Sequence, residues 1–252
     1  MKRTVILIYG VLSYAFFLAT FLYAIGFVGN LFVPKSIDAA PTVPLVQALL
    51  IDAALLAVFA FQHSIMARPA FKRWITRFIP REAERSTFVL AASAALALMF
   101  AYWEPLGGGV WQVESSTAVL ALHALCAFGW GLVLFATFLI DHFDLFGLRQ
   151  VWLQFRGVPY TNPEFVTPAP YRVVRHPLYL GFLLAFWATP VSHLVFALAT
   201  TAYIVIAIQL EERDLVAAHP EYAEYRRRVP MLIPGLKRAP RAAEHTAKPA
   251  AS

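Results

Sequence analysis

A short stretch around residue 175 combines residue types that bind anions. Arg175 and His176 directly precede Pro177, and Tyr179 and Gly181 follow. Proline is favoured at the first position of a helix, where free backbone N–H groups and the positive end of the helix dipole also lie. Tyr179, four residues after Arg175, can face the same side, and Gly181 leaves room for a neighbouring helix or a ligand. This pattern predicts a helix start that binds a carboxylate.

Two carboxylates and two tyrosines farther along the chain extend the pattern. Glu211 and Glu212 end a long apolar run, and Tyr222 and Tyr225 follow. Adjacent residues point about 100° apart on a helix, so we expect at most one carboxylate to face a ligand. That carboxylate could accept hydrogen bonds from ribose hydroxyls or from an amino group. The tyrosines could cover an adenine ring or anchor a helix in the membrane interface.

Histidines at the ends of two other apolar runs are candidate proton acceptors. Gln62 and His63 end one run, and Asp141, His142 and Asp144 follow another. A neutral histidine can remove a proton near physiological pH, and a neighbouring carboxylate can orient it or raise its pKa. Polar residues at these positions can also simply mark the ends of membrane helices. The spacing is not that of a metal-binding motif, so we expect no metal site.

The elements that must position these residues are membrane helices. Only 14% of the 252 residues are charged and 60% are hydrophobic, whereas a soluble domain carries about 25% charged residues. Four segments, 5–33, 44–66, 86–103 and 117–140, approach or exceed the roughly 20 apolar residues that a span requires. A fifth, 177–210, is too long for one span and is interrupted at Pro190. We expect this fifth segment to form a helical hairpin that turns at residues 190–193.

The distribution of basic residues sets the expected orientation. If the fifth segment folds back on itself, 20 of the 21 Lys and Arg residues lie on one side of the membrane. The positive-inside rule makes that side cytoplasmic, so the net charge of +6 reports topology and not nucleic-acid binding. The predicted fold class is an all-α polytopic membrane protein with four transmembrane helices, a C-terminal helical hairpin and a cytoplasmic helical tail. Both termini are expected in the cytoplasm.

The chain is expected to form one domain. Residues 1–236 make up a single membrane-embedded unit, with the ligand-binding part at about 170–236, and the Ala- and Pro-rich tail 237–252 is expected to be disordered. Cys126 is the only cysteine, which excludes a disulfide framework and favours a packing role. Asp52 is a costly residue within an apolar run, and its position suggests no role.

The C-terminal motifs resemble those of one superfamily of membrane enzymes. In chain order they are Arg175-His176-Pro177-x-Tyr179-x-Gly181, Glu211-Glu212, Tyr222-x-x-Tyr225, Val229-Pro230 and Pro234-Gly235. This ordered set is similar to that of isoprenylcysteine carboxyl methyltransferase and the phospholipid N-methyltransferases. The resemblance implies that these residues bind S-adenosylmethionine.

Two further stretches resemble a narrower family within that superfamily. Residues 62–69 and 141–149 are similar to the corresponding stretches of bacterial methanethiol S-methyltransferases, so the likeness runs through nearly the whole chain. The resemblance implies an enzyme of the bacterial inner membrane that methylates the small thiol methanethiol to dimethyl sulfide. Two alternatives stay open. One is a methyltransferase for a lipid, a prenylcysteine or another thiol, and the other is a non-catalytic membrane subunit for transport or assembly.

The implied reaction assigns roles to the polar residues. Methyl transfer to a thiol requires two aligned sulfurs, exclusion of water and removal of one proton. We expect His63 or His142 to act as the base, with Asp141 or Asp144 orienting its partner. Arg175 is expected to hold the cofactor carboxylate or to stabilise the thiolate. Methanethiol has almost nothing to hydrogen-bond, so its pocket should be small and apolar, and the bilayer can deliver it.

Overall fold

The computed structural model describes residues 2–107, 113–163, 165–189 and 193–236, and within these ranges all regular secondary structure is helical. Helices satisfy their own backbone N–H and C=O groups, which an apolar chain in lipid requires. The predicted all-α fold class is therefore confirmed. Most of the expected hairpin turn, residues 190–192, and the expected tail 237–252 lie outside the described residues.

The helices in chain order, including one 3-10 helix (η1), are as follows: α1 Lys2–Gly29, α2 Leu45–Met66, α3 Pro69–Ile75, η1 Arg81–Ala83, α4 Glu84–Tyr102, α5 Ser116–Leu139, α6 His142–Leu145, α7 Leu148–Arg156, α8 Ala169–Val173, α9 Pro177–Trp187, α10 Leu194–Ala218 and α11 Tyr222–Arg228.

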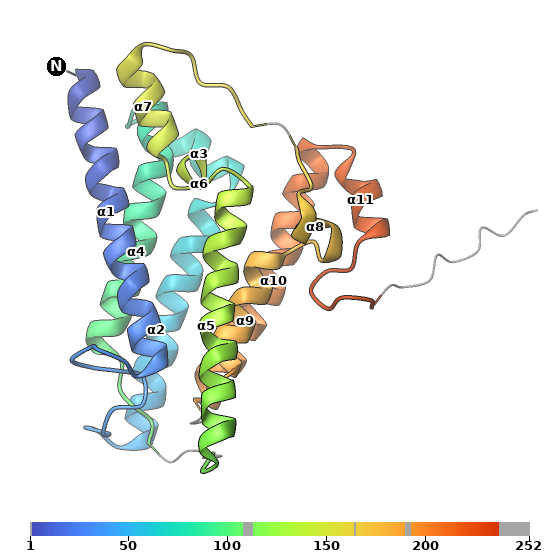
Figure 1. Cartoon of the computed structure of the whole chain (residues 1–252). Coiled ribbons are helices and arrows are strands. Elements are labelled where there is room, and N and C mark those ends of the chain that lie inside the picture. The colour runs from blue at the N-terminus through green and yellow to red at the C-terminus, as the bar shows by residue number, and fades with distance from the viewer. Residues whose placement is uncertain (1, 108–112, 164, 190–192, 237–252) are drawn as a thin grey trace, which may run out of the picture.

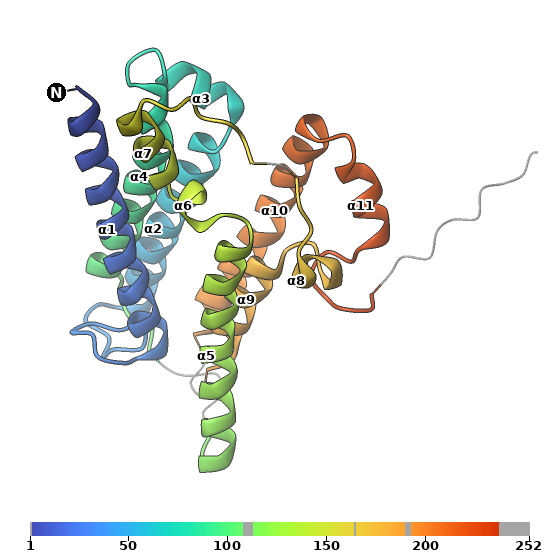
Figure 2. The ribbon, with the colours of Figure 1, turned by 45° about the horizontal axis from the view of Figure 1, so that its top comes forward.

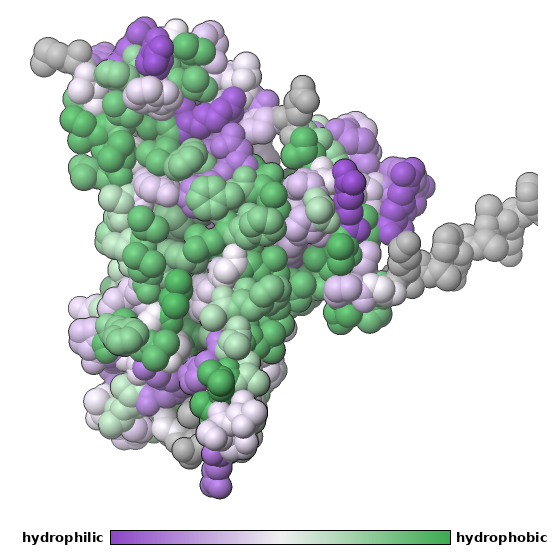
Figure 3. All heavy atoms as spheres, viewed as in Figure 1, coloured by the Kyte–Doolittle hydropathy of each residue, from purple (hydrophilic) through white to green (hydrophobic). Residues whose placement is uncertain are grey.

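Five helices are long and apolar enough to cross a membrane, namely α1, α2, α4 with the preceding η1, α5 and α10. Helix α9 is apolar but has only 11 residues, or roughly 16 Å of helix, against a hydrocarbon core of about 30 Å. Figure 3 shows apolar side chains around the middle of the molecule and polar ones gathered toward its two ends. A multi-pass membrane protein is thus confirmed, while the number of crossings stays a prediction.

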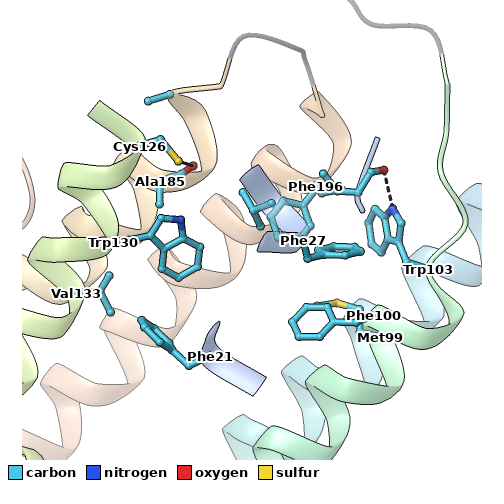
Figure 4. Close-up of a cluster of buried hydrophobic side chains, with 13 residues drawn as sticks. Phe21, Phe27, Met99, Phe100, Trp103, Cys126, Trp130, Val133, Ala185 and Phe196 are labelled. Atoms are coloured by element: carbon cyan, nitrogen blue, oxygen red, sulfur yellow. Dashed lines mark hydrogen bonds between the residues drawn. The ribbon is translucent and has the colours of Figure 1, made fainter. Parts of the chain in front are cut away.

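Two sets of helices share the core. Helices α1, α2 and α4 pack together, and α5 packs along α9 (Figure 1). Figure 4 shows Trp130 of α5 beside Ala185 of α9, while Phe27, Phe100 and Trp103 join α1 to α4. In Figures 1 and 2, α8 and α11 lie on the side of the bundle away from α1.

Two glycines let α5 and α9 meet at their backbones. A side-chain carbon on Gly181 would lie 2.7 Å from the carbonyl oxygen of Gly129, and one on Gly129 would lie 2.6 Å from the backbone nitrogen of Ala185. Both distances are shorter than any carbon contact allows, so only glycine fits. Of the two neighbours expected for Gly181, a helix or a ligand, the structure shows a helix.

Polar contacts sort the helix ends into two groups. Where α1 begins, the Tyr9 hydroxyl lies 2.9 Å from that of Thr87 on α4, and Arg68 after α2 lies 2.9 Å from Asp214 on α10. Figure 1 shows α3, α6 and α7 at this end, which we call the N-terminal end of the bundle. His63, Asp141, His142, His176 and Pro177 lie at helix ends, whereas Glu211 and Glu212 lie in the last turns of α10.

The opposite end explains the buried Asp52. Its Oδ1 accepts a hydrogen bond of 2.8 Å from the backbone N–H of Glu104, which follows α4. On the same end His193 Nδ1 lies 3.1 Å from Asp38 Oδ2, which ties the start of α10 to the segment after α1. Asp52 therefore fixes the chain as it leaves α4, a role that the sequence did not reveal.

Two helix boundaries differ from the predicted spans. Helix α1 ends at Gly29 rather than at 33, because Asn30 and Phe32 adopt left-handed backbone angles with φ of 54° and 55°, and asparagine tolerates this region. Helix α10 continues past 210 to Ala218, so Glu211 and Glu212 lie inside a helix rather than at its end. Two further turns of α10 thus carry the acidic residues toward α11.

Candidate active site

Glu212 is the centre of a buried hydrogen-bond network. Its Oε1 accepts from Arg175 Nε at 2.6 Å, from His176 Nε2 at 3.0 Å and from the Tyr222 hydroxyl at 3.4 Å. Its side chain is only 4% exposed and that of Arg175 only 11%. Burial of a charged pair is tolerated when both charges are paired and hydrogen-bonded, as they are here. The network joins the start of α9, the last turns of α10 and α11.

Arg175 also holds the segment that follows α11. Its Nη1 donates to the carbonyl oxygen of Val229 at 2.6 Å. The backbone N–H groups of Arg175 and His176 donate to the carbonyls of Pro230 and Met231 at 2.9 and 3.2 Å. The motif before α9 and the Val-Pro motif after α11 are therefore one structural unit.

Glu211 faces a different set of groups from Glu212. Its Oε2 lies 3.9 Å from His176 Nδ1, and its carboxylate acts electrostatically on the Tyr179 hydroxyl. The Tyr179 ring is 5.5 Å from the His176 ring. Glu211 Oε2 is buried yet accepts no hydrogen bond from any residue that the structure describes. Such an atom can accept from a bound hydroxyl or amino group.

Aromatic rings gather on the outer side of this network. Phe165 lies edge-on to Tyr222 and Tyr225, with centroids 5.8 and 5.7 Å away. The Tyr225 hydroxyl donates to the carbonyl oxygen of Tyr171. Burial raises the pKa of Tyr225 to about 12, so it remains a donor at neutral pH. These rings offer flat apolar surfaces beside the two carboxylates.

Hydrogen bonds connect the end of α2 to α10. Arg68 Nη1 donates to Asp214 at 2.9 Å and to the carbonyl of Leu210 at 3.3 Å. The Ser64 hydroxyl lies 3.1 Å from that of Tyr203. These bonds bring the 62–69 stretch against the helix that carries Glu211.

His63 sits in this junction with a free ring nitrogen. Phe59 stacks on its ring at 5.3 Å, and Phe88 of α4 approaches at 4.9 Å. His63 Nδ1 and Gln62 Oε1 are buried, and within the described ranges neither makes a hydrogen bond. Gln62 Nε2 donates a hydrogen bond to the sulfur of Met66 at 3.0 Å. His63 therefore keeps one nitrogen available to accept or share a proton.

His142 differs because both of its ring nitrogens are engaged. The Thr137 hydroxyl donates to the Leu134 carbonyl at 2.7 Å, so it can only accept from His142 Nδ1, 2.8 Å away. Nε2, 2.8 Å from the Tyr14 hydroxyl, must then accept. Burial lowers the pKa of His142, which keeps the ring neutral. Phe138 stacks on it at 4.2 Å, so the geometry favours a packing role.

The two aspartates beside His142 stabilise the turn from α5 into α6. Asp141 has a left-handed backbone, with φ of 76°, and its Oδ1 accepts from the backbone N–H of Asp144 at 3.1 Å to start α6. Asp144 accepts from Arg149 at 2.8 Å and from the Tyr160 hydroxyl at 3.2 Å. Within the described part of the chain neither carboxylate hydrogen-bonds to His142, whose ring nitrogens face Thr137 and Tyr14, but the charge of Asp141 acts on the imidazole and opposes the lowering of its pKa.

The structure thus gathers most of the predicted residues into one region and separates the rest. Those brought together through Glu212, α9 and α11 are Arg175, His176, Pro177, Tyr179, Glu211, Glu212, Tyr222 and Tyr225. His142 belongs to a second hydrogen-bond network with α1 and α5, and Asp141 caps α6 and lies 3.9 Å from Arg149. Among the described residues, no group of three His, Cys, Asp or Glu side chains is placed to hold a metal ion.

Sequence reasoning missed four residues that join α2 to α10. They are Ser64, Arg68, Tyr203 and Asp214. Ser64 and Arg68 lie in the 62–69 stretch, and Asp214 follows the paired glutamates by two positions. A search for charge partners between these two polar groups would have found the Arg68–Asp214 pair.

The chain matches no family model and no solved structure, but it is similar to curated proteins over most of its length. The methanethiol S-methyltransferase of Crocosphaera subtropica is 56% identical over 238 residues, which cover 93% of each chain. That of Mycobacterium tuberculosis is 52% identical over 238 residues, covering 93% of this chain and 98% of the relative. Nurim of Bos taurus is 30% identical over 191 residues, covering 71% of this chain and 70% of nurim.

Proposed function

Because the chain belongs to the family of methanethiol S-methyltransferases, we propose that it transfers a methyl group from S-adenosylmethionine to methanethiol and releases dimethyl sulfide. The predicted family and the predicted enzyme class are confirmed by these relatives, which removes the alternative of a non-catalytic transport or assembly subunit. We further propose one domain over residues 1–236 in the bacterial inner membrane, with both termini and the N-terminal end of the bundle in the cytoplasm, where the cofactor is made.

The chemistry of the residues around Glu211 fits this cofactor. Glu211 Oε2, buried and without a hydrogen bond from a described residue, suits a ribose hydroxyl or the amino group. Tyr222 and Tyr225 with Phe165 offer ring faces for adenine. Arg175 keeps its Nη2 group for the cofactor carboxylate, since Nε and Nη1 are used on protein oxygens. When bound, the cofactor supplies an electrophilic methyl group on a sulfonium.

His63 is the proposed base. Its buried Nδ1 has no partner among the described residues, whereas both nitrogens of His142 are engaged. Arg68 and Arg85 place positive charge beside His63, which favours the thiolate form of a bound thiol. The thiol proton passes to Nδ1, and the thiol sulfur uses its electron pair to bond the methyl carbon. The electron pair of the broken carbon–sulfur bond stays on the sulfur that carried the methyl group.

The observation that carries this proposal is the unpartnered nitrogen of His63 at a junction that hydrogen bonds connect to the Glu211 helix. The test uses purified protein in lipid nanodiscs, with cofactor binding by calorimetry and dimethyl sulfide measured in the headspace of sealed vials. His63→Ala is expected to bind the cofactor normally and to lose about 100-fold or more in kcat. The loss should shrink at high pH, where thiolate forms without a base.

Matched variants separate the parts of the proposal. Glu211→Ala is expected to weaken cofactor binding, whereas Glu221→Ala, at an exposed carboxylate, should leave it unchanged. Wild-type protein that binds the cofactor but forms no dimethyl sulfide would contradict the acceptor. Folded protein that binds no S-adenosylmethionine would contradict the cofactor.

A further inference from the structure

Two aromatic rings pack on His63, and a third packs on one of these two. Phe59 of α2 and Phe88 of α4 flank it at 5.3 and 4.9 Å. Tyr203 of α10 lies edge-on to Phe59, with ring centroids 6.1 Å apart. We call Phe59, His63, Phe88 and Tyr203 the His63 ring group. It forms a small environment with apolar walls and a single imidazole at its centre.

The unpartnered nitrogen of His63 points to a ligand with one weak donor. His63 Nδ1 and Gln62 Oε1 are both buried and lack hydrogen bonds within the part of the chain that the structure describes. Buried polar atoms almost always have a partner, so two adjacent exceptions on one helix need an explanation. A thiol S–H is a weak donor that suits one such acceptor, and its alkyl carbon suits ring faces.

The His63 ring group also borders the proposed cofactor residues. Tyr203 is bonded to Ser64 on one side, and on the other it acts electrostatically on Tyr179 together with Arg68 and Glu211. Ring contacts therefore run from His63 through Phe59 to Tyr203, and electrostatic interactions connect Tyr203 and Glu211 to Tyr179. An acceptor at His63 would share this buried region with the methyl donor, which direct transfer requires.

We propose that the His63 ring group is the acceptor site, and that Phe59 and Phe88 set the size of the thiol that it admits. The proposal rests on the proposed function and adds to it the residues that select a one-carbon thiol. Their rings pack on the imidazole, so a thiol that binds at Nδ1 meets them, and their size limits the alkyl chain that it can carry. Replacing either ring by a smaller side chain should admit ethanethiol.

The test measures the ratio of kcat/KM for ethanethiol to kcat/KM for methanethiol, from ethyl methyl sulfide and dimethyl sulfide in the headspace. One methylene in a fitted apolar pocket changes selectivity by about 10-fold or more. We expect Phe59→Ala and Phe88→Ala each to raise the ratio by about this factor. Phe61→Ala is the matched control on α2, because Phe61 is 71% exposed, and its ratio should equal that of wild type.

A binding measurement makes the result independent of turnover. Protein loaded with S-adenosylhomocysteine is titrated with ethyl methyl sulfide and observed by saturation-transfer NMR, and the two alanine variants should bind it more tightly than wild type does. If an alanine variant fails to retain S-adenosylhomocysteine, Phe59→Leu or Phe88→Leu replaces it. The leucine variants should also raise the kcat/KM ratio and tighten thioether binding, by less than the alanine variants do.

Two outcomes are distinguishable. Wild-type protein that forms no dimethyl sulfide contradicts the proposed function itself. Active wild-type protein whose variants retain S-adenosylhomocysteine but show the wild-type ratio and the wild-type thioether binding overturns the acceptor site at the His63 ring group.

Discussion

Removing the Glu212 carboxylate tests the central network of the structure. Glu212 accepts from Arg175, His176 and Tyr222, and its side chain is 4% exposed. Glu212→Ala leaves the Arg175 guanidinium buried, with backbone carbonyls as its remaining partners. Breaking one side of a buried ion pair costs about 3–5 kcal/mol, because the other charge stays uncompensated. We expect a loss of that size in the free energy of unfolding.

A double-mutant cycle separates the pair from the rest of the network. Arg175→Ala should also destabilise the protein, since it removes the bonds to Val229 and to Glu212 together. The double variant no longer buries an unpaired charge, so its loss should be smaller than the sum of the two single losses by about 1–3 kcal/mol. Reversible unfolding by sodium dodecyl sulfate in mixed micelles, followed by circular dichroism, gives all four free energies.

An exposed pair on α11 is the control for this cycle. Arg228 lies 2.7 Å from Glu224, but the two side chains are 74% and 45% exposed. Arg228→Ala and Glu224→Ala should leave the free energy of unfolding unchanged within error, because water screens such pairs. Additive losses at Arg175 and Glu212, or a Glu212→Ala variant as stable as the control variants, would refute the buried network as described.

Three further predictions address other contacts. Gly181→Val places side-chain carbons against the backbone of α5 and should cost about 1–3 kcal/mol in unfolding free energy. Gly131→Val should be neutral by the same assay, because a side-chain carbon there meets no atom of another element within 4 Å. The unfolding temperature of wild type should fall as pH drops below about 6.5, since burial lowers the pKa of folded His142 and the unfolded chain then binds more protons. His142→Asn should show a smaller slope between pH 7 and pH 5, and an equal slope would contradict the neutral buried ring. Asp52→Asn keeps an acceptor for the Glu104 N–H and should be tolerated, while Asp52→Leu should lose about 1–3 kcal/mol of unfolding free energy.

The runs of apolar residues in the sequence predicted where the helices lie, but they did not predict which helices contact one another. The four predicted spans correspond to α1, α2, α4 and α5, because a run of apolar residues in lipid can only be helical. The predicted helix boundaries were wrong where a left-handed backbone or a charged residue determines the end of the helix. Asn30 ends α1 early, and α10 continues through Glu211 and Glu212, where the charge of Glu212 is paired with Arg175 just before α9.

The same holds for the candidate active site, where residue types identified the candidates but not their hydrogen-bond partners. Arg175 and Glu212 were identified as candidates, but their bond spans 37 positions and the motif spacing carries no sign of it. His142 was an equally good candidate base as His63 by residue type. Only its contact with Tyr14, 128 positions away, shows that its second nitrogen is occupied.

The glycine contact between α5 and α9 has a consequence for how the site is held in place. With their backbones touching, the two helices cannot slide or separate without a large loss of packing, so α9 holds Arg175 and His176 at a fixed depth although it lacks the length to cross the bilayer alone. Helix α11 and the last turns of α10 attach to this wall through the Glu212 network and through the backbone hydrogen bonds of Arg175 and His176 to the segment after α11. The rigid wall of the site is thus α5 with α9, and the residues of α10 and α11 are positioned by what they bond on that wall.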